Sequence, residues 1–417
     1  MEIVLNLILL LGSLQYVKGT GLEVVYQWKY LDWIWPQVHL TGKNFTLGNA
    51  FTQDVDVDRY GRLFVTSPQW LEGVPIALSL LTTAKGLGGP LLVPYPDWTW
   101  HTARSCESIV SVYRLAVNII DECNRLWVVD TGRIGSNAVC PTKILIFDLA
   151  TDELIHKYVV PGDQVLHGKA ALVTPIVDVG KTCVDTYLYV ADVDQNGLLI
   201  YDLYHDRSWR VNNTRGNAFG PDNDAMNITI KNGLFRYLYF NSLASYRQKF
   251  TDTNSLKQSE FIEPLVYESN YKRASQAGVQ ATSRRGVIFF QLVQLTAIAC
   301  WNIEKPFIPE NVVIIAQDEE TLQYVSGIKV ITNKRGDEEL WFNTNRLQKT
   351  INKTLKPTEA NFRIIRGRVD DIIRGTNCEL GGELFALLPQ HPRDTNRARN
   401  SGKFVSPTSL STAQFGV

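Results

Sequence analysis

The sequence predicts an all-β protein, a six-bladed β-propeller, and two observations carry that prediction. A strand signature with a central aromatic residue recurs six times, at intervals of 50 to 63 residues. Each copy follows a shorter strand-like segment and a turn. The central aromatic residues are Phe64, Trp127, Tyr189, Tyr239, Phe289 and Trp341. Because apolar strands repeated at this spacing are typical of sheets arranged around an axis, six copies predict six blades.

The strands of each repeat can be placed in order along the chain. In the first repeat, the alternating segment 54–58 turns at 59–61 and returns as the aromatic strand 62–66. The second repeat pairs 112–121 with 125–130 and adds 143–149. The third pairs 175–180 with 187–192 and passes through Asn196-Gly197, a preferred hairpin dipeptide, into 198–202. The last three repeats turn at 232–233, near 284–286 and at 335–337.

The segment 24–35 precedes the first repeat and has the composition of one more aromatic strand, VVYQWKYLDWIW. We expect it to complete the last blade by pairing with strands from the C-terminal end. Such pairing closes the ring and removes exposed sheet edges. The predicted domain organisation is a signal peptide at 1–19, the propeller at 20–389 and a polar, disordered tail at 390–417.

Several features predict a secreted, extracellular glycoprotein. The N-terminus carries an apolar run from Ile3 to Leu14, too short to span a bilayer comfortably, and no later segment is long and apolar enough to do so. Four glycosylation sequons occur, at Asn44, Asn212, Asn227 and Asn352. Six cysteines allow up to three disulfides in any of 15 pairings: Cys106, Cys123, Cys140, Cys183, Cys300 and Cys378.

Composition and motifs exclude several classes of function. Lysine and arginine together number 42, as do aspartate and glutamate, so the net charge gives no support for a nucleic-acid partner. No motif for a serine nucleophile, a phosphate-binding loop or a redox dithiol is present, and we expect no cofactor. The segment 192–197 matches the start of a calcium loop, but Leu203 occupies the position of the essential glutamate. We therefore expect a hairpin turn there and no metal site.

The geometry of a propeller points to a candidate binding site. The ends of the second strands and the starts of the innermost strands converge on one face around the central channel. Hydroxyls, amides and a few carboxylates dominate these positions, which suits a small polar aromatic ligand. The alternative is that these groups only satisfy loop backbone or bind water. The candidates for ligand binding are Trp70, Asp130, Ser326, Asn343 and Asn345.

Catalysis is the second possibility at this face. His101 lies among aromatic residues in YPDWTWH (95–101) and is a candidate general base, although a packed structural histidine is the alternative. Asp192 is the other candidate base, and Arg346 is the candidate donor to a developing oxyanion.

Long stretches of the chain resemble the Yellow/major royal jelly protein family. The similarity is carried by SPQWLEGVPIALS (67–79), LLVPYPDWTWH (91–101), SVYRLAVNIIDECNRLWVVDTG (111–132), CPTKILIFDLATDELIHKYVVP (140–161), ADVDQNGLLIYD (191–202), SWRVNN (208–213), GVIFFQLVQLTAIACWN (286–302) and LQYVSGIKV (322–330). The Yellow branch of insects is the more similar one. The resemblance implies a secreted six-bladed propeller with a role in melanin and cuticle pigmentation. It also implies that Asn345 occupies the position of an amine-contacting Asn, while Leu347 stands where amine binders carry an aromatic residue.

These observations lead to three functional hypotheses. The first is a secreted Yellow-like pigmentation protein that binds a small aromatic amine, a catechol-derived ligand or cuticle components. The second is an enzyme that converts dopachrome by isomerisation or decarboxylation. The third is a structural or nutritive glycoprotein without a ligand. The propeller fold accommodates all three, so the site has to decide among them.

Overall fold

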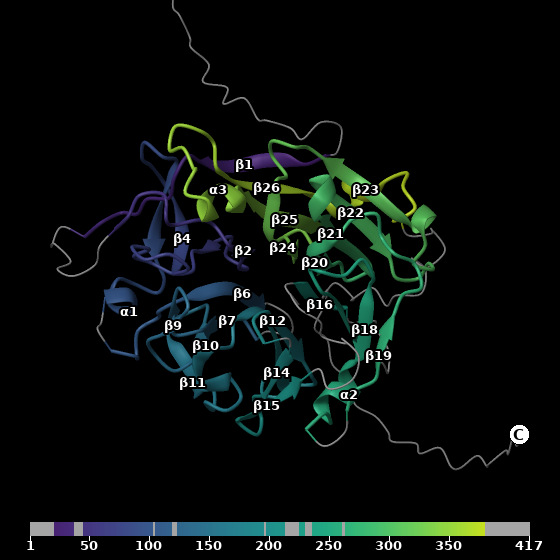
Figure 1. The fold of residues 1–417 in the computed structure, drawn as a ribbon, viewed down its shortest axis with the longest axis horizontal. Helices are drawn as coiled ribbons and strands as arrows, with labels where there is room; N and C mark the ends of the chain where they lie inside the picture. Colours follow the sequence, from purple (N-terminus) through teal and green to yellow (C-terminus); the bar gives the residue numbers. More distant parts are fainter. Residues whose placement is uncertain are drawn as a thin grey trace, which may run out of the picture. The chain divides into compact units, whose positions relative to one another are not determined.

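The computed structural model describes residues 21–36, 45–102, 105–118, 123–195, 197–212, 225–229, 236–260 and 263–379. Six antiparallel sheets of four strands stand around a central axis, as Figure 1 shows. The all-β, six-bladed propeller predicted from the repeats is therefore confirmed. The predicted signal peptide, the predicted tail, Asn44 and the turn at 232–233 lie outside the described residues.

Each blade runs from an innermost to an outermost strand. Blade 1 holds β2 (Asp54–Val57), β3 (Leu63–Thr66), β4 (Leu78–Lys85) and β5 (Pro90–Pro94), and blade 2 holds β6 (Val112–Asn118), β7 (Arg125–Asp130), β10 (Lys143–Asp148) and β11 (Leu154–Val159). Blade 3 holds β12 (Leu172–Val179), β13 (Thr186–Asp192), β14 (Gly197–Asp202) and β15 (Arg207–Asn212), and blade 4 holds β16 (Ala225–Thr229), β17 (Tyr237–Asn241), β18 (Lys249–Asp252) and β19 (Val266–Glu268). Blade 5 holds β20 (Ala277–Thr282), β21 (Val287–Leu292), β22 (Ala297–Asn302) and β23 (Val312–Gln317).

Blade 6 is built from both ends of the described chain. It holds β24 (Tyr324–Thr332), β25 (Glu338–Asn345), β26 (Phe362–Arg368) and, as its outermost strand, β1 (Glu23–Trp28). The remaining short elements are the pair β8 (Arg133–Ile134) and β9 (Asn137–Ala138), the helices α1 (Thr99–Thr102), α2 (Thr253–Lys257), α3 (Leu347–Ile351) and α4 (Val369–Ile373), and the 3₁₀ helices η2 (Leu166–Gly168), η3 (Val293–Leu295) and η4 (Pro309–Asn311). None of the helices in the described ranges combines the length and the apolar character that a bilayer crossing requires.

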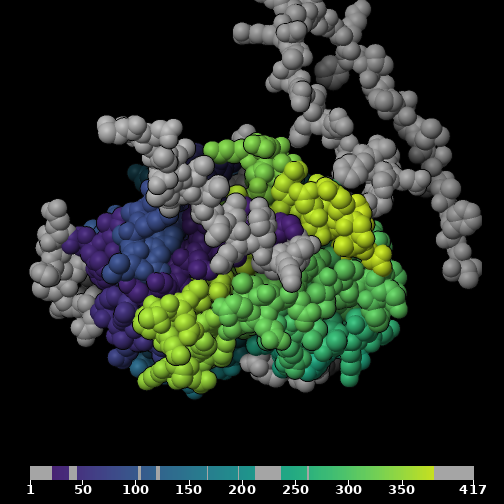
Figure 2. Space-filling view, turned by 90° about the horizontal axis from the view of Figure 1, so that it is seen from above, coloured from purple at the N-terminus to yellow at the C-terminus, as the bar shows by residue number. Residues whose placement is uncertain are grey.

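The N-terminal strand closes the ring, as the sequence predicts. β1 pairs with β26 in antiparallel register, from Glu23 opposite Arg366 to Trp28 opposite Phe362. Beyond the strand, the Trp28 indole nitrogen donates to the Pro90 carbonyl of blade 1 at 2.7 Å. The same segment therefore completes blade 6 and fastens it to blade 1. In Figure 2 the purple N-terminal residues and the yellow C-terminal residues meet on the surface.

The hydrophobic core lies between neighbouring blades, and this explains the recurring aromatic signature. Phe64 of blade 1 packs in the cluster shared with blade 2, and Trp127 of blade 2 in the cluster shared with blade 3. Tyr189 and Tyr239 occupy the same place between blades 3 and 4 and between blades 4 and 5. Trp341 fills the junction of blade 6 with blade 1. The second strand of each of these blades thus supplies one large ring to the interface with the next blade.

The structure also resolves the cysteine pairing that the sequence left open. The disulfides are Cys106–Cys140, Cys123–Cys183 and Cys300–Cys378, and no free cysteine remains in the described ranges. Cys123–Cys183 joins the first turns of blades 2 and 3. Cys300–Cys378 ties β22 of blade 5 to the residues beyond α4, so it holds the C-terminal end of the described chain against the ring.

Loss of this last disulfide is expected to loosen the ring closure. Its cysteines are 78 residues apart, so the chain-entropy relation gives a stabilisation of about 4 kcal/mol. We expect Cys300→Ser with Cys378→Ser to lower the free energy of unfolding by roughly 2 to 5 kcal/mol, measured by urea denaturation without reductant. Removing Cys106–Cys140, which spans 34 residues, is the matched control and should cost somewhat less. An unchanged midpoint for the Cys300 variant would contradict a role in closure.

Candidate functional site

A buried polar cluster lies where blade 6 meets blade 1, at the starts of their inner strands. Asn343 and Asn345, at the end of β25, donate through Nδ2 to the Thr52 carbonyl at 3.0 and 2.8 Å. The same amides donate to Ser326 Oγ at 2.7 and 2.9 Å. All four residues are at most 2% exposed. The structure thus brings together Ser326, Asn343 and Asn345, which the sequence predicted as ligand residues, and joins them through Thr52.

A β-bulge gives Ser326 its position. The register between β24 and β25 shifts between Val325 and Gly327, so Ser326 has no cross-strand partner in the ladder. Inner strands β6, β12 and β20 carry comparable irregularities near their starts. Bulges re-aim side chains at functional edges of sheets, and here they turn inner-strand residues toward the centre of the ring.

Two buried oxygens at this place accept no hydrogen bond from any residue in the described ranges. They are Asp54 Oδ1, on β2, and Asn343 Oδ1, on β25. Both lie against the Cα atom of Gly327, and a β-carbon at that position would collide with each of them. Glycine is therefore required there. Because a buried acceptor gains from a hydrogen-bond donor, the two oxygens are candidate acceptors for a donor group of a ligand. We call Thr52, Asp54, Ser326, Asn343 and Asn345 the mouth cluster.

The other oxygen of Asp54 is held by a lysine from the opposite side of the junction. Asp54 Oδ2 lies 2.8 Å from Lys329 Nζ of β24 and accepts from the Leu115 amide at 3.1 Å. Lys329 also donates to the Leu115 carbonyl at 2.8 Å. Asp54 is fully buried. The carboxylate is therefore oriented and neutralised through one oxygen, while the other oxygen faces the mouth cluster.

A second cation crosses the ring centre in the opposite direction. Arg114, on β6 of blade 2, donates through Nε to the Ser326 carbonyl of blade 6 at 2.8 Å and through its guanidinium to the Thr174 hydroxyl of blade 3. Lys329 makes the reciprocal crossing from blade 6 to blade 2. These two side chains join blades 2 and 6, which are not neighbours, through polar contacts next to the mouth cluster.

Asp56 lies two residues further along β2 and is also buried, with 5% of its surface exposed. Its carboxylate accepts from the Val117 amide and from the Val57 amide, both at 2.9 Å. Burial raises the pKa of Asp56 to about 7, against the lowering effect of the Lys329 ammonium, and nearby Asp54 adds to the rise. Together Asp54, Asp56 and Lys329 satisfy the backbone groups on the free inner edge of β6.

Trp70 provides an exposed aromatic surface near this place. Its side chain is 40% exposed, and its ring centroid lies 5.9 Å from that of buried Phe51, which directly precedes Thr52. Trp70 was a sequence candidate for contact with an aromatic or cationic ligand. Its exposure and its neighbour keep it a candidate at the rim of the mouth cluster.

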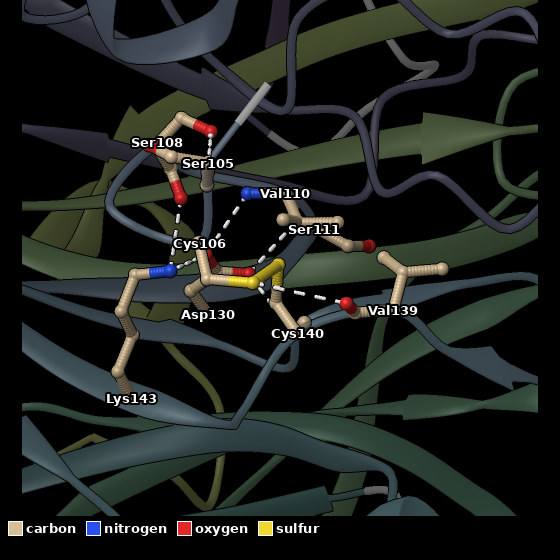
Figure 3. Close-up of a disulfide and its surroundings, with 10 residues drawn as sticks. Ser105, Cys106, Ser108, Val110, Ser111, Asp130, Val139, Cys140 and Lys143 are labelled. Carbon is tan, nitrogen blue, oxygen red and sulfur yellow. Dashed lines mark hydrogen bonds and ion pairs between the residues drawn. A yellow bond between two sulfur atoms is a disulfide. The ribbon is translucent and has the colours of Figure 1, made fainter. Parts of the chain in front are cut away.

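Asp130 and Asp192, in contrast, are engaged in a repeated structural arrangement. Asp130 accepts from the amides of Val110, Ser111 and Gly132 at 2.8 to 3.0 Å and pairs with buried Lys143 at 2.8 Å, beside the Cys106–Cys140 disulfide (Figure 3). Asp192 accepts from the amides of Ala171, Asp194 and Gln195 at 2.9 to 3.2 Å and pairs with Arg210 at 2.7 Å. Each carboxylate therefore fixes the segment leading into the inner strand of its own blade. The ligand role of Asp130 and the catalytic role of Asp192 stay predictions.

His101 and Arg346 also have structural contacts. His101 is buried in α1, at the periphery of the ring in Figure 1, and its Nε2 lies 2.9 Å from the Tyr95 carbonyl. Arg346 follows the mouth cluster in sequence, and its guanidinium binds the carboxylates of Glu320 and Glu359. The three predicted catalytic residues thus come from blade 3, blade 6 and a peripheral helix. No interaction in the described ranges joins them to one another, and their catalytic roles stay predictions.

Three residues of the candidate site were missed by sequence reasoning: Asp54, Arg114 and Lys329. The sequence does contain a signal, since segment 54–58 (DVDVD) places three acidic residues on one face of a strand that is expected to be innermost. Inner-strand side chains that bond across the ring are visible only once neighbouring blades are placed. Among the described residues, no group of three or more His, Cys, Asp or Glu side chains is arranged to hold a metal ion.

Three of the four predicted glycosylation sites lie in the described part of the chain. Asn352 is exposed in the turn after α3. Asn212 lies in β15 and Asn227 in β16. Whether any of them carries a glycan stays a prediction.

Comparison with known proteins supports one family throughout. The family model of the major royal jelly proteins matches residues 110–378, more than half of the chain. Major royal jelly protein 9 of Apis mellifera is 34% identical over 403 residues, which covers 88% of this chain and 92% of that protein. The dopaminechrome tautomerase of Drosophila melanogaster is 32% identical over 405 residues, covering 86% and 84%. The yellow protein of Drosophila simulans is 30% identical over 464 residues, covering 95% and 84%.

These matches agree with the segments that carried the resemblance in the sequence, and they extend over nearly the same range. The six blades and the closing β1 strand agree with the fold that the family resemblance implied, and the similarity covers most of the chain. The chain therefore belongs to the Yellow/major royal jelly protein family.

Proposed function

We propose that this chain is a secreted, Yellow-like protein of melanin and cuticle pigmentation that binds a small catechol-derived ligand, such as an aromatic amine, at the mouth cluster. The observation that carries the proposal is the pair of unsatisfied oxygens, Asp54 Oδ1 and Asn343 Oδ1, beside Gly327. An ammonium group or a catechol hydroxyl supplies the donor that this pair lacks. The exposed ring of Trp70 offers an aromatic face at the rim.

Other observations support the biological setting. Three disulfides are typical of proteins that fold in an oxidising, extracellular compartment. Relatives named yellow and dopaminechrome tautomerase support a link to catechol-derived pigments. Cuticle components are a further class of possible partner in this setting.

The binding proposal is tested by calorimetric titration of the purified protein with dopamine. We expect saturable binding, weakened at least tenfold by Asn343→Ala and by Gly327→Ala, because the first removes an acceptor and the second places a methyl group against both oxygens. Asn352→Gln, an exposed change on the same blade, is the control and should leave the affinity unchanged. Equal affinity in wild type and Asn343→Ala, with both proteins folded by circular dichroism, would reject the mouth cluster as the binding site.

A second candidate function is conversion of a quinone-type derivative of such a ligand, as in a dopachrome-converting enzyme. One specific observation favours it, namely a buried carboxylate with one free oxygen beside a lysine at the mouth cluster. A carboxylate held in this way suits proton abstraction next to an electron-poor ring. A relative named dopaminechrome tautomerase supports the same reaction class.

A further inference from the structure

We propose that Asp54 is the general base of a tautomerisation carried out on an indoline quinone bound at the mouth cluster, and that Lys329 is the residue that positions it. This inference rests on the proposed function, since it requires a catechol-derived ligand at that site. It assigns the chemistry to two inner-strand residues, in place of the three residues that the sequence indicated.

The first step of the argument is the asymmetry of the Asp54 carboxylate. One oxygen is bound by Lys329 Nζ at 2.8 Å and by the Leu115 amide at 3.1 Å, which fixes its rotamer. The other oxygen has no donor among the described residues and points to the same place as Asn343 Oδ1. A base that is fixed through one oxygen and has no donor on the other needs no reorientation when a substrate C–H group reaches it.

The second step is the charge around Asp54. The titratable and charged groups that face it are Lys329 on β24, Asp56 on its own strand and Arg114 on β6, whose guanidinium reaches the Ser326 carbonyl. Lys329 places a positive charge 2.8 Å from Asp54 Oδ2, so the buried carboxylate is paired with a cation through that oxygen. Burial instead holds Asp56 largely in its neutral form below pH 7, which limits like-charge repulsion between the two side chains.

The third step is a comparison with the other buried acids. Asp130 and Asp192 each accept three backbone amides and pair with one cation, so their oxygens are directed into their own blades. Asp178, on inner strand β12, pairs with Arg236 and with Lys257 at 3.0 Å, on the side of the ring away from the mouth cluster. Asp54 differs from these acids because it combines a fixed orientation with an oxygen that faces the predicted ligand.

The reaction that this geometry serves is an isomerisation and needs no oxidant. Asp54 Oδ1 takes a proton from one of the two saturated ring carbons of the indoline quinone, and the C–H electron pair forms a double bond to the six-membered ring. The electrons move to a quinone oxygen, which becomes an oxyanion and receives a proton, so this first transfer gives the quinone-methide tautomer. Loss of a second proton, from the other saturated ring carbon, and protonation of the second oxygen then give the dihydroxyindole. Two protons leave carbon and two are added to oxygen, so the product is an isomer of the substrate. The Thr52 hydroxyl accepts from Asn343 and keeps its own proton for donation to the developing oxyanion.

The experiment follows the decay of dopaminechrome in the presence of purified full-length protein, with product identified chromatographically. We expect Asp54→Asn to lower kcat about 10²- to 10⁴-fold, a larger effect than its effect on dopamine binding, because asparagine cannot take the proton. Lys329→Gln should lower kcat at least tenfold, because the carboxylate loses the contact that fixes its orientation, and Lys329→Arg, which keeps the cation, should restore most of the activity. Asp178→Asn removes a paired inner-strand carboxylate away from the mouth cluster and should keep wild-type activity.

The outcomes separate this inference from the proposed function. If wild type accelerates decay and Asp54→Asn does so equally, the assignment of the base is wrong and the activity stands. If wild type binds dopamine without accelerating decay, the catalytic inference is overturned and the binding function stands. If wild type neither binds nor converts, both fall. A Lys329→Gln variant with reduced activity that Lys329→Arg does not restore would leave Lys329 a structural residue and overturn its positioning role.

Discussion

The substitution Asp130→Ala is expected to lower the free energy of unfolding by about 3 to 5 kcal/mol. Asp130 is fully buried, and the side chain of its partner Lys143 is 3% exposed. Without the carboxylate, the Lys143 ammonium keeps only the Ser108 carbonyl, at 2.8 Å, and three backbone amides lose their acceptor. A buried, uncompensated charge is among the most destabilising changes a single substitution can make.

Urea denaturation followed by tryptophan fluorescence measures this loss. The double variant Asp130→Ala with Lys143→Met should recover roughly 2 kcal/mol of the free energy of unfolding, because it removes the buried, unpaired ammonium group. The dopamine affinity of the single variant is measured at a low temperature at which the variant is folded. This measurement separates the structural role from the ligand role predicted for Asp130. A loss below about 1 kcal/mol together with greatly weakened binding would favour the ligand role.

The substitution Asp56→Asn is expected to stabilise the protein in a pH-dependent manner. The folded pKa of Asp56, about 7, lies above its ordinary value of 3.8, so the folded state holds this proton more tightly than the unfolded state. The favourable contribution of the proton is complete below about pH 4 and is lost as the pH rises to 7. At 1.36 kcal/mol for each pH unit, the ionised carboxylate costs roughly 4 kcal/mol above pH 7.

Because asparagine cannot ionise, the variant does not suffer this loss. We expect its stability relative to wild type to rise by about 2 to 4 kcal/mol from pH 4 to pH 8, measured by thermal denaturation across the range, on top of a constant cost because its Nδ2 cannot accept from the Val117 or Val57 amide. The advantage should grow between pH 4 and 7 and then level off. A difference that stays constant with pH would mean that Asp56 does not titrate in this window.

The sequence predicts the architecture well because a propeller is a repeated solution to one packing problem. In five of the blades the aromatic residue at the centre of the second strand packs into the interface with the next blade, so the repeat can be recognised directly from the sequence. The closing role of segment 24–35 could also be predicted, since a strand-like segment with no repeat of its own needs a partner. The outermost strands of the blades were harder to predict from the sequence. β11, for example, alternates half-buried and exposed residues and includes charged and polar ones, so it has no distinctive signature.

The candidate site was predicted only in part, and the reason is physical. Ser326, Asn343 and Asn345 lie on adjacent strands of one blade, and local spacing places them together. The partners of Asp54, Leu115 of blade 2 and Lys329 of blade 6, both lie more than 60 residues further along the chain, and no local pattern encodes such contacts. Asp130 and Asp192, at the ends of second strands, were candidates for ligand binding and catalysis because of their carboxylates, and the structure buries both and pairs each with a cation.

The pairing of β1 with β26 has a consequence for how the protein is made. Glu23 and Arg366, 343 residues apart in sequence, form an ion pair across this seam. During translation β1 is synthesised more than 300 residues before its partner β26. Until then, β1 has to remain unpaired without aggregating or pairing with another strand. Every premature stop before Phe362 leaves β1 without its partner and the junction around Trp28 open to solvent. Completion of the ring therefore requires that synthesis has reached the last strand of blade 6.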